Sequence, residues 1–427
     1  MEIGALILFS FIILIILSVP ISISMGIATM LGIFASDYVF EVLPLMISRG
    51  TSNYALIAIP YFVLAGNLMN TGGITNRIFE FSNTLLGHIK GGLAQVNVLA
   101  SMIFSGISGT AAADAAGLGL VEINAMTDKG YEKSFSTAIT LASSIIGPII
   151  PPSVPFLIYA VLANVSVGKL FVAGIIPGVL VGFILMATNY YLAAKKKVKI
   201  PEAEPFELIK VIKAFKNGFF ALLAPVVLLG GIMSGLATPT EAGIIAVLYS
   251  LLVGYIYKEL TLEGIINALR YTIYSAALIM FLIGMGKALG WVTTAERLPI
   301  LASEFLFGLT NNKILLLLII NVFLIILGMV LDGVTISLIM VPILLPIIKT
   351  LGVNTLQFGV ILTLNTLIGS ATPPVGVGLF IMSSITDLSL PQIVKSFIPY
   401  FIPLVIALIL ITYIPFITTW LPSIIFP

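Results

Sequence analysis

The sequence predicts an all-α polytopic membrane protein built as an inverted-topology repeat, and three observations support this fold class. Hydrophobic residues make up 59% of the 427 residues and charged residues only 9%, whereas a soluble domain is typically about 25% charged. The apolar runs lack the alternation of a membrane barrel, so the spans are predicted to be helices. Two apolar segments are also interrupted by glycine and proline, at 147–152 and 369–374.

A constant offset relates the two interruptions. Gly369 lies 369 − 147 = 222 residues after Gly147, and the same offset takes Gly106 to Gly328, Gly130 to Gly352 and Pro177 to Pro399. Interrupted apolar segments in corresponding positions of two halves are typical of transporter binding sites. The backbone groups that such breaks free must line a cavity or bind a ligand, because lipid cannot satisfy them.

The first half, residues 1–194, is expected to contain five membrane segments, because a spanning helix needs about 20 apolar residues. They are expected at 4–19, 21–36, 54–70, 133–165 (broken at 147–152) and 170–194. The stretch 93–126 lies between the third and fourth segments and has small residues at its middle. Its arms are short for a span, so we expect a re-entrant hairpin whose tip stops inside the protein.

The second half, residues 218–427, repeats this arrangement. Its segments are expected at 219–236, 240–257, 271–291, 355–386 (broken at 369–374) and 397–420. The second re-entrant hairpin is expected at 313–348, with Gly328 and Asp332 near its tip. Segments 74–91 and 259–270 are amphipathic and are interpreted as interfacial helices that lie along the membrane, with connecting loops as the alternative.

The lysine-rich segment 195–217 is the boundary between the halves, and the positive-inside rule makes it a cytoplasmic linker. Five segments precede it and five follow it, so both termini are expected on the periplasmic side of a bacterial inner membrane. An odd number of spans in each half inserts the two halves upside down relative to each other. The hairpins then enter from opposite faces, which gives two-sided access to one central site.

Each hairpin, together with the broken helix of its own half, is expected to hold one cation. Sodium prefers hard oxygen ligands, and half-helix C-termini present carbonyl oxygens. The candidates for the first cation site are Ser105, Ser108, Thr110, Gly147, Pro148 and Pro151. The candidates for the second are Gly328, Asp332, Thr335, Gly369, Thr372 and Pro373. Close helix packing is the alternative role for any single small residue.

The substrate is expected between the two hairpin tips, where half-helix N-termini attract carboxylates. The candidate contacts are Ser108, Thr110, Asp114, Ser153, Asp332 and Asn365. Asp332 is the strongest single candidate, since an ionisable group at membrane depth is costly and usually functional. The alternative is that Asp332 only caps the second hairpin arm. For Asp114, hydrogen bonding within its own helix is equally compatible with the sequence.

The composition argues against enzymatic chemistry and against a cofactor. The chain has no cysteine and one histidine, His88, which leaves thiol nucleophiles and Cys/His metal sites without support. No Walker-type phosphate loop is present, so ATP is not the direct energy source. Sodium is the expected coupling ion.

Several motifs occur in the same order as in a known family. They are Gly72-Gly73-Ile74, Leu86-Gly87-His88, Phe104-Ser105-Gly106-Ile107-Ser108-Gly109-Thr110, Ile146-Gly147-Pro148-Ile149-Ile150-Pro151-Pro152-Ser153 and Ala237-Thr238-Pro239-Thr240-Glu241. With these motifs the chain resembles the large membrane subunit of TRAP (tripartite ATP-independent periplasmic) transporters, and in detail that of sialic-acid systems.

The resemblance implies an elevator fold of the ion-transporter superfamily and sodium-driven import of a small organic acid, with sialic acid favoured. It also implies a periplasmic substrate-binding protein and a small four-helix membrane subunit, expected here as a separate polypeptide. By match to the family's motifs, Ser105, Ser108, Thr110 and Gly147 would belong to the first sodium site, and Gly328, Asp332, Gly369 and Thr372 to the second. The alternatives are a self-sufficient sodium/carboxylate transporter of the same superfamily and an ion channel.

Overall fold

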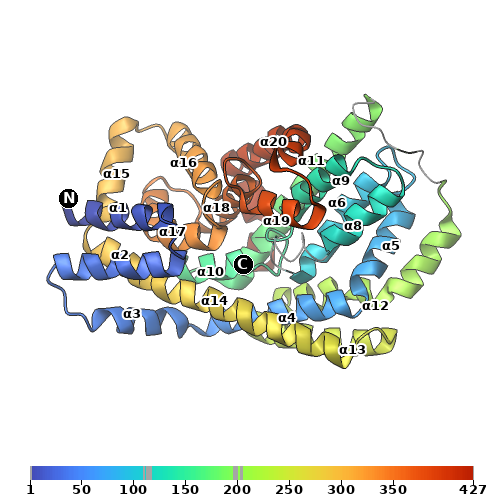
Figure 1. Cartoon of the computed structure of the whole chain (residues 1–427), viewed down its shortest axis with the longest axis horizontal. Coiled ribbons are helices and arrows are strands. Elements are labelled where there is room, and N and C mark those ends of the chain that lie inside the picture. Colours follow the sequence, from blue (N-terminus) through green and yellow to red (C-terminus); the bar gives the residue numbers. More distant parts are fainter. Residues whose placement is uncertain (1, 109–110, 112–117, 196–200, 202–204, 427) are drawn as a thin grey trace.

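A computed structural model describes residues 2–108, 111, 118–195, 201 and 205–426. These residues form helices joined by turns and contain no strand (Figure 1). Among them, seven helices are long and apolar enough to cross a membrane. These are Tyr54–Thr71 (the 3₁₀ turn η1, Tyr54–Ile57, with α4, Ala58–Thr71), α11 (Val167–Ala194), α12 (Leu208–Met233), α13 (Pro239–Tyr257), α14 (Leu262–Ala295), α17 (Gly333–Thr350) and α20 (Leu390–Tyr413).

Both predicted hairpins are present. In the first half, α6 (Leu93–Ser108) is followed by α8 (Leu118–Asp128). In the second half, α16 (Lys313–Gly328) turns directly into α17.

Both predicted broken helices are present as well. The first consists of α9 (Lys133–Ser144) and α10 (Val154–Ala163), and the second of α18 (Thr355–Ser370) and α19 (Val377–Thr386). Each break contains a cis X–Pro bond, at Pro151–Pro152 and at Pro373–Pro374. Together with the hairpins, these elements confirm the predicted fold class.

The longest helix corrects the expected interfacial helix at 259–270. Thr261 caps α14 by accepting a hydrogen bond from the Gly264 amide, and the helix then continues without interruption for 34 residues. At 1.5 Å per residue its length is about 51 Å, well beyond the roughly 30 Å hydrocarbon core. Residues 262–270 are therefore the first turns of α14 and not a separate element.

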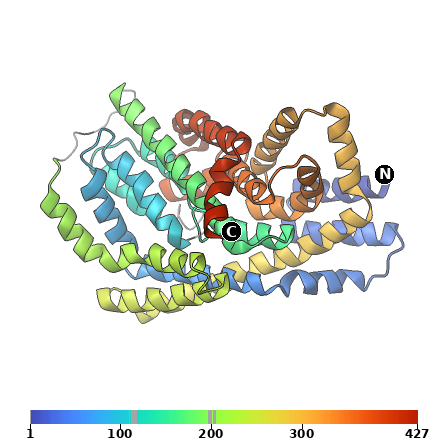
Figure 2. The same cartoon turned by 180° about the vertical axis from the view of Figure 1, so that it is seen from behind.

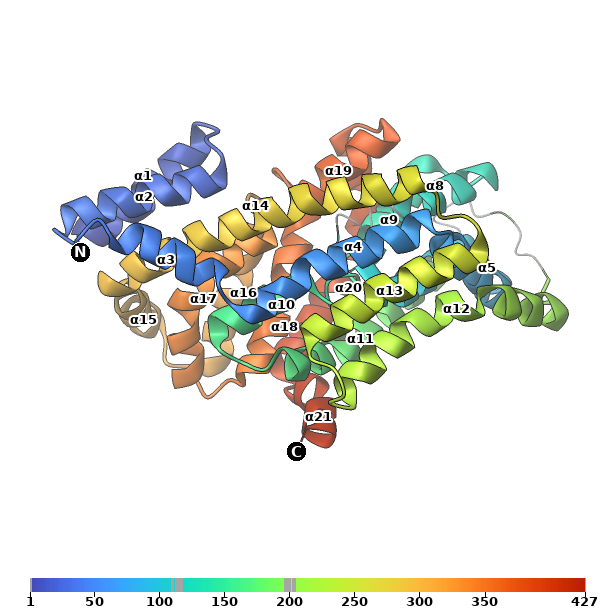
Figure 3. The same ribbon diagram turned by 90° about the horizontal axis from the view of Figure 1, so that it is seen from below.

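The repeat explains what α14 corresponds to in the first half. The offset of 222 takes 42–71 to 264–293, because 42 + 222 = 264 and 71 + 222 = 293. Residues 42–71 form α3 (Val42–Thr51), η1 and α4, which run along α14 (Figure 3). In the first half the helix is divided, because Asn53 accepts a hydrogen bond from the Ala55 amide and starts a new turn.

Other bounds also differ from the predicted segments. α1 (Glu2–Ile16) and α2 (Ile21–Ala35) have 15 residues each and are shorter than the expected spans 4–19 and 21–36. The expected span 397–420 is divided at Pro415 into α20 and α21 (Phe416–Ile425). α12 begins at Leu208, inside the segment assigned to the linker. The short helices α3 and α15 (Leu298–Leu309) were not predicted, while α5 (Ile74–Leu86) lies in the predicted amphipathic segment 74–91.

The helices form two layers. α3, α4, α12, α13 and α14 lie along one side, and the hairpins, the broken helices, α11 and α20 lie on the other (Figures 1 and 2). The halves of the broken helices that precede the breaks are the most buried parts, since every residue from Gln357 to Gly369 in α18 is buried. We call the first layer the scaffold and the second layer the hairpin layer.

Candidate functional site

A cavity of about 200 Å³ lies where the two broken helices meet the tip of the second hairpin. Ser144 and Pro148 line it from the end of α9 and the first break, and Thr366 and Ser370 line it from α18. Asp332 lines it from the hairpin tip. Chain segments that the offset relates therefore meet around one space, as expected for a central site between two repeats.

Helix ends dominate the cavity wall. The first residues of three helices line it, Val154 and Pro155 of α10, Gly333 and Val334 of α17, and Val377 and Gly378 of α19. The C-terminal ends of α9 and α18 line it as well. Helix N-termini carry partial positive charge and C-termini partial negative charge. The cavity is thus equipped for an anion beside the N-termini and for cations beside the C-termini, and the described lining residues include no lysine or arginine.

The N-terminus of α19 differs from the other two. Ser153 caps α10 by accepting a hydrogen bond from the Phe156 amide, and Asp332 caps α17. The N-cap of α19 is Gly376, which has no side chain and adopts the left-handed conformation at φ +61°. Its own amide donates to Met329 O at the tip of the second hairpin, over 2.7 Å. This bond ties the second break to the second hairpin.

Asp332 acts as a helix cap in the structure. Its Oδ1 accepts hydrogen bonds from the amides of Val334 (2.9 Å) and Thr335 (3.0 Å), and its Oδ2 accepts one from the Thr335 hydroxyl. The structure thus shows Asp332 as the cap of α17, and its role in binding stays a prediction. Asp332 also lines the cavity.

Gly328 and Gly369 are in direct backbone contact. A Cβ added at Gly369 would lie 2.6 Å from Gly328 Cα and 2.6 Å from Ile325 O. A Cβ added at Gly328 would lie 3.0 Å from Gly369 Cα. The two glycines therefore allow α16 and α18 to approach closely, which is the packing role of small residues in membrane helices. Neither glycine lines the cavity.

The other candidates of the second cation site lie in α17 and in the second break. Thr335 is buried, and the Thr372 hydroxyl donates to Ile368 O over 2.7 Å. Pro373 is exposed and, like Thr335 and Thr372, is not part of the cavity wall.

The first cation site is only partly described. Ser105 is buried and its hydroxyl donates to Ser101 O. Gly147 and Pro151 are buried at the break, and the carbonyl oxygen of Pro148 accepts from the Ser153 hydroxyl. Thr110, Asp114 and the side chain of Ser108 lie outside the described residues. Of the predicted site residues that the structure describes, Asp332 and Pro148 line the cavity.

A pair of buried polar contacts was not predicted. The Asn97 side chain in α6 accepts a hydrogen bond from the Ser143 hydroxyl over 2.7 Å. The Asn321 side chain in α16 accepts one from the side-chain amide of Asn365 over 2.9 Å. Ser143 and Asn365 are related by the repeat, because 143 + 222 = 365. Each contact joins the first arm of a hairpin to the first part of the broken helix in its own half. The sequence signal that could have indicated these contacts is an asparagine within an apolar helix. Asn365 lies behind the cavity wall and not on it.

Comparisons with known proteins agree on one family. Residues 8–417 match the family described as the tripartite ATP-independent periplasmic transporter, DctM component. The sialic acid TRAP transporter large permease protein SiaM of Vibrio cholerae is 41% identical over 376 residues, which are 88% of this chain and 87% of that protein. The sialic acid TRAP transporter permease protein SiaT of Haemophilus influenzae is 39% identical, over 96% of this chain and 67% of that protein.

Two further similarities bear on substrate and fold. The C4-dicarboxylate TRAP transporter large permease protein DctM of Pseudomonas aeruginosa is 36% identical over 94% of each chain. The crystal structure of the Alcanivorax borkumensis YdaH transporter has a similar fold, with a TM-score of 0.63 over 86% of each chain at 14% identity. At this identity the second similarity concerns the fold alone.

Proposed function

Because the chain belongs to the DctM family, the large permease component of tripartite ATP-independent periplasmic transporters, we propose that it uses a sodium gradient to import a small organic acid. The protein is accordingly a multi-span bacterial membrane protein. The observation that carries the proposal is the cavity where three helix N-termini and two helix C-termini meet. Such a cavity suits a carboxylate and its coupling cations without a basic side chain.

Sialic acid is the substrate that we favour, because two relatives named for sialic acid are 41% and 39% identical to this chain. A relative named for C4-dicarboxylates is 36% identical, so a dicarboxylate is the competing choice. Pockets for small molecules usually exceed about 300 Å³, and the cavity has about 200 Å³. We therefore propose that the cavity widens when the substrate enters.

Two sodium ions are proposed at the ends of α9 and α18. The first would use Ser105, Ser108, Thr110 and the carbonyl groups of Gly147, Pro148 and Pro151. The second would use Asp332, Thr335, Thr372 and the carbonyl groups of Gly328, Gly369 and Pro373. The support is the location of both groups at breaks in helices, where backbone carbonyls lack helical partners.

We propose that transport follows an elevator mechanism. The hairpin layer would move past the scaffold, and the repeats 1–194 and 218–427 would give the cavity access to each face in turn. In this proposal the linker 195–217 is cytoplasmic and both termini are periplasmic, as the lysines predict. A small membrane subunit would pack on the scaffold, and a periplasmic binding protein would deliver the substrate.

Reconstitution tests this function. The chain would be placed in proteoliposomes with its small subunit, and uptake of labelled sialic acid would be measured with and without the binding protein and an inward sodium gradient. We expect uptake only when both are present, and excess unlabelled C4-dicarboxylate should not compete. Uptake with sodium alone would identify a self-sufficient carrier, and uptake without any gradient coupling would indicate a channel. Competition by the dicarboxylate would reassign the substrate.

A further inference from the structure

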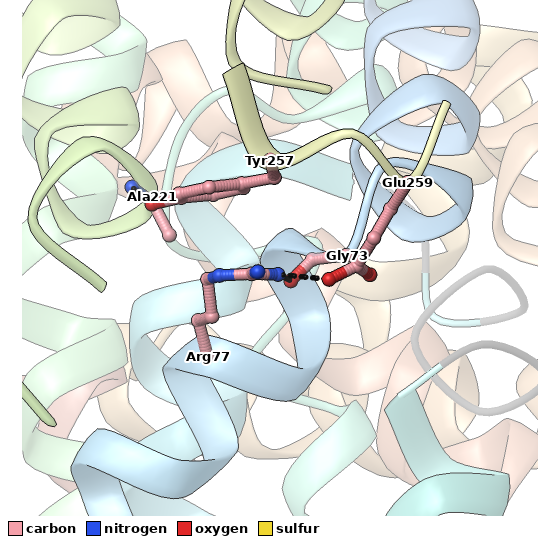
Figure 4. A network of polar contacts seen from close by, with 5 residues as sticks. All are labelled: Gly73, Arg77, Ala221, Tyr257 and Glu259. Atoms are coloured by element: carbon pink, nitrogen blue, oxygen red, sulfur yellow. Dashed lines mark hydrogen bonds and ion pairs between the residues drawn. The ribbon is translucent and has the colours of Figure 1, made fainter. Parts of the chain in front are cut away.

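A polar cluster at one end of the scaffold joins α5, α12, α13 and the turn before α14 (Figure 4). Arg77 Nη1 forms an ion pair with Glu259 Oε1 at 2.7 Å and donates to Gly73 O over 2.8 Å. The guanidinium carbon lies 3.7 Å from the centre of the Tyr257 ring, a cation–π geometry. The Tyr257 hydroxyl in turn accepts from the Ala221 amide over 3.1 Å.

The backbone is shaped to admit this cluster. Gly73, the N-cap of α5, adopts φ +77°, and a Cβ at this position would overlap Glu259 Oε2. Glycine is therefore required both by the left-handed conformation and by the approach of the carboxylate. Arg77 and Glu259 border a surface hollow of about 460 Å³, with side-chain exposures of 21% and 41%. An ion pair this exposed to solvent contributes little to stability. Its main effect is to fix the position of α5 relative to the turn that contains Glu259.

The cluster lies at a connection between the scaffold and the hairpin layer. α5 leads from the scaffold helix α4 to α6, the first arm of the first hairpin. Its counterpart is α15, which leads from α14 to α16, the first arm of the second hairpin. The N-caps of both helices are left-handed, Gly73 and Arg297, and 297 − 73 = 224. Both are the connections through which the chain passes from the scaffold to the hairpin layer.

The second connection is held in a similar way. Just before α15, Glu296, the C-cap of α14, accepts a hydrogen bond from the Ser36 hydroxyl over 2.7 Å. The neighbouring Glu296 carboxylate also raises the pKa of Tyr38. The offset of 222 takes Ser36 to 258, immediately before Glu259. The start of α5 is thus bonded to the turn before α14, and the start of α15 is bonded to the turn before α3. In both cases the turn belongs to the opposite half of the chain.

From this symmetry we infer that Arg77, Tyr257 and Glu259 are positioning residues that fix the scaffold end of α5, so that the first hairpin pivots about a stationary point during transport. The inference rests on the proposed elevator function. The three side chains belong to scaffold or connecting elements, and none of them lines the cavity. Loosening them is therefore expected to slow the movement of the hairpin while leaving the binding of substrate and sodium intact.

The test compares Arg77→Gln with Arg270→Gln, a matched control at an exposed arginine of α14. Hydrogen exchange of the α5 amides would be measured first, because it does not depend on transport. We expect exchange in α5 to rise severalfold in Arg77→Gln and to stay unchanged in the control. Arg77→Lys keeps the charge but loses the planar stacking on Tyr257, and should give an intermediate result.

Uptake by the same variants completes the test. We expect the maximal rate of Arg77→Gln to fall about tenfold, as misplacement of a supporting element can produce, with unchanged KM for substrate and unchanged sodium dependence. Unchanged exchange in α5 would refute the positioning role whatever the transport result. Raised exchange with a normal maximal rate would refute its role in transport. A wild-type chain that exchanges as expected but transports nothing would contradict the proposed function and leave the positioning role standing.

Discussion

Replacing Gly369 by alanine provides a sharp test of the contact between the second hairpin and the second broken helix. The added Cβ would lie 2.6 Å from Gly328 Cα, and ordinary van der Waals contact begins at 3.4 Å. The helices must separate by 3.4 − 2.6 = 0.8 Å. Gly369 lies within helix α18, so alanine fits the backbone, and its carbonyl group is retained. Any effect therefore arises from displacement and not from the loss of a ligand.

The expected size follows from this displacement. α16 leads into the hairpin tip, where Asp332 and Gly333 line the cavity. Functional sites tolerate errors of about 0.5 Å, and a misplacement of about 1 Å can cost about 100-fold in rate. We expect Gly369→Ala to reduce sodium-driven uptake roughly 10- to 100-fold. Overpacking should cost about 1–3 kcal/mol in unfolding free energy, offset by about 1 kcal/mol of helix propensity.

Gly230→Ala is the matched control. Gly230 lies within α12, and a Cβ there would meet nothing within 4 Å. This variant should transport normally and gain up to about 1 kcal/mol in stability. Uptake in proteoliposomes and thermal unfolding would be measured for both variants at equal protein content. Wild-type uptake by Gly369→Ala would show that the two helices are not held in the close contact described here, and would refute the reasoning.

Four further substitutions test the cavity and the helix cap beside it. Asp332→Asn keeps a good N-cap but removes the charge. Sodium-driven uptake should fall about tenfold, which corresponds to the loss of one charge-assisted contact, and thermal unfolding should change little. Unchanged sodium dependence would restrict Asp332 to capping. Ile279→Trp should block uptake by filling the cavity from α14, whereas Ile279→Val should transport, and equal rates would remove Ile279 from the path. Ser153→Ala should lower the unfolding free energy by about 1 kcal/mol, measured by denaturation; unchanged stability would contradict its role as the cap of α10.

The sequence was sufficient for the features that local chemistry determines. Glycine and proline cannot continue a membrane helix without freeing backbone groups, so the breaks at 147–152 and 369–374 were found correctly. The continuity of α14 was missed because Glu263 and Arg270 give the same pattern on an interfacial helix as on the exposed start of a long helix. Only packing against α3 and α4 separates the two cases.

The site was harder to predict, because its wall consists largely of main-chain groups and of residues distant in sequence. Ile279 of α14 lines the cavity but has no local signal that separates it from other apolar residues of the same helix. Gly328 and Gly369 were assigned to ion binding from their places at the second hairpin tip and in the second break. The structure shows that they also contact each other. The sequence alone does not distinguish a glycine that allows two helices to approach closely from a glycine that leaves its carbonyl group free.

The helix termini around the cavity have a consequence for how selectivity can evolve. The partial positive charge at the starts of α10, α17 and α19 belongs to the backbone and remains when side chains are exchanged. Under the proposed function, attraction for a carboxylate would therefore be inherited with the fold itself. Mutation can then act only on the volume and outline of the space, through neighbours such as Ile279 and Val377. Such an arrangement of helix ends would keep a constant preference for acids as a class, while the choice of one acid would depend on the shape of the cavity and on the binding protein that we propose.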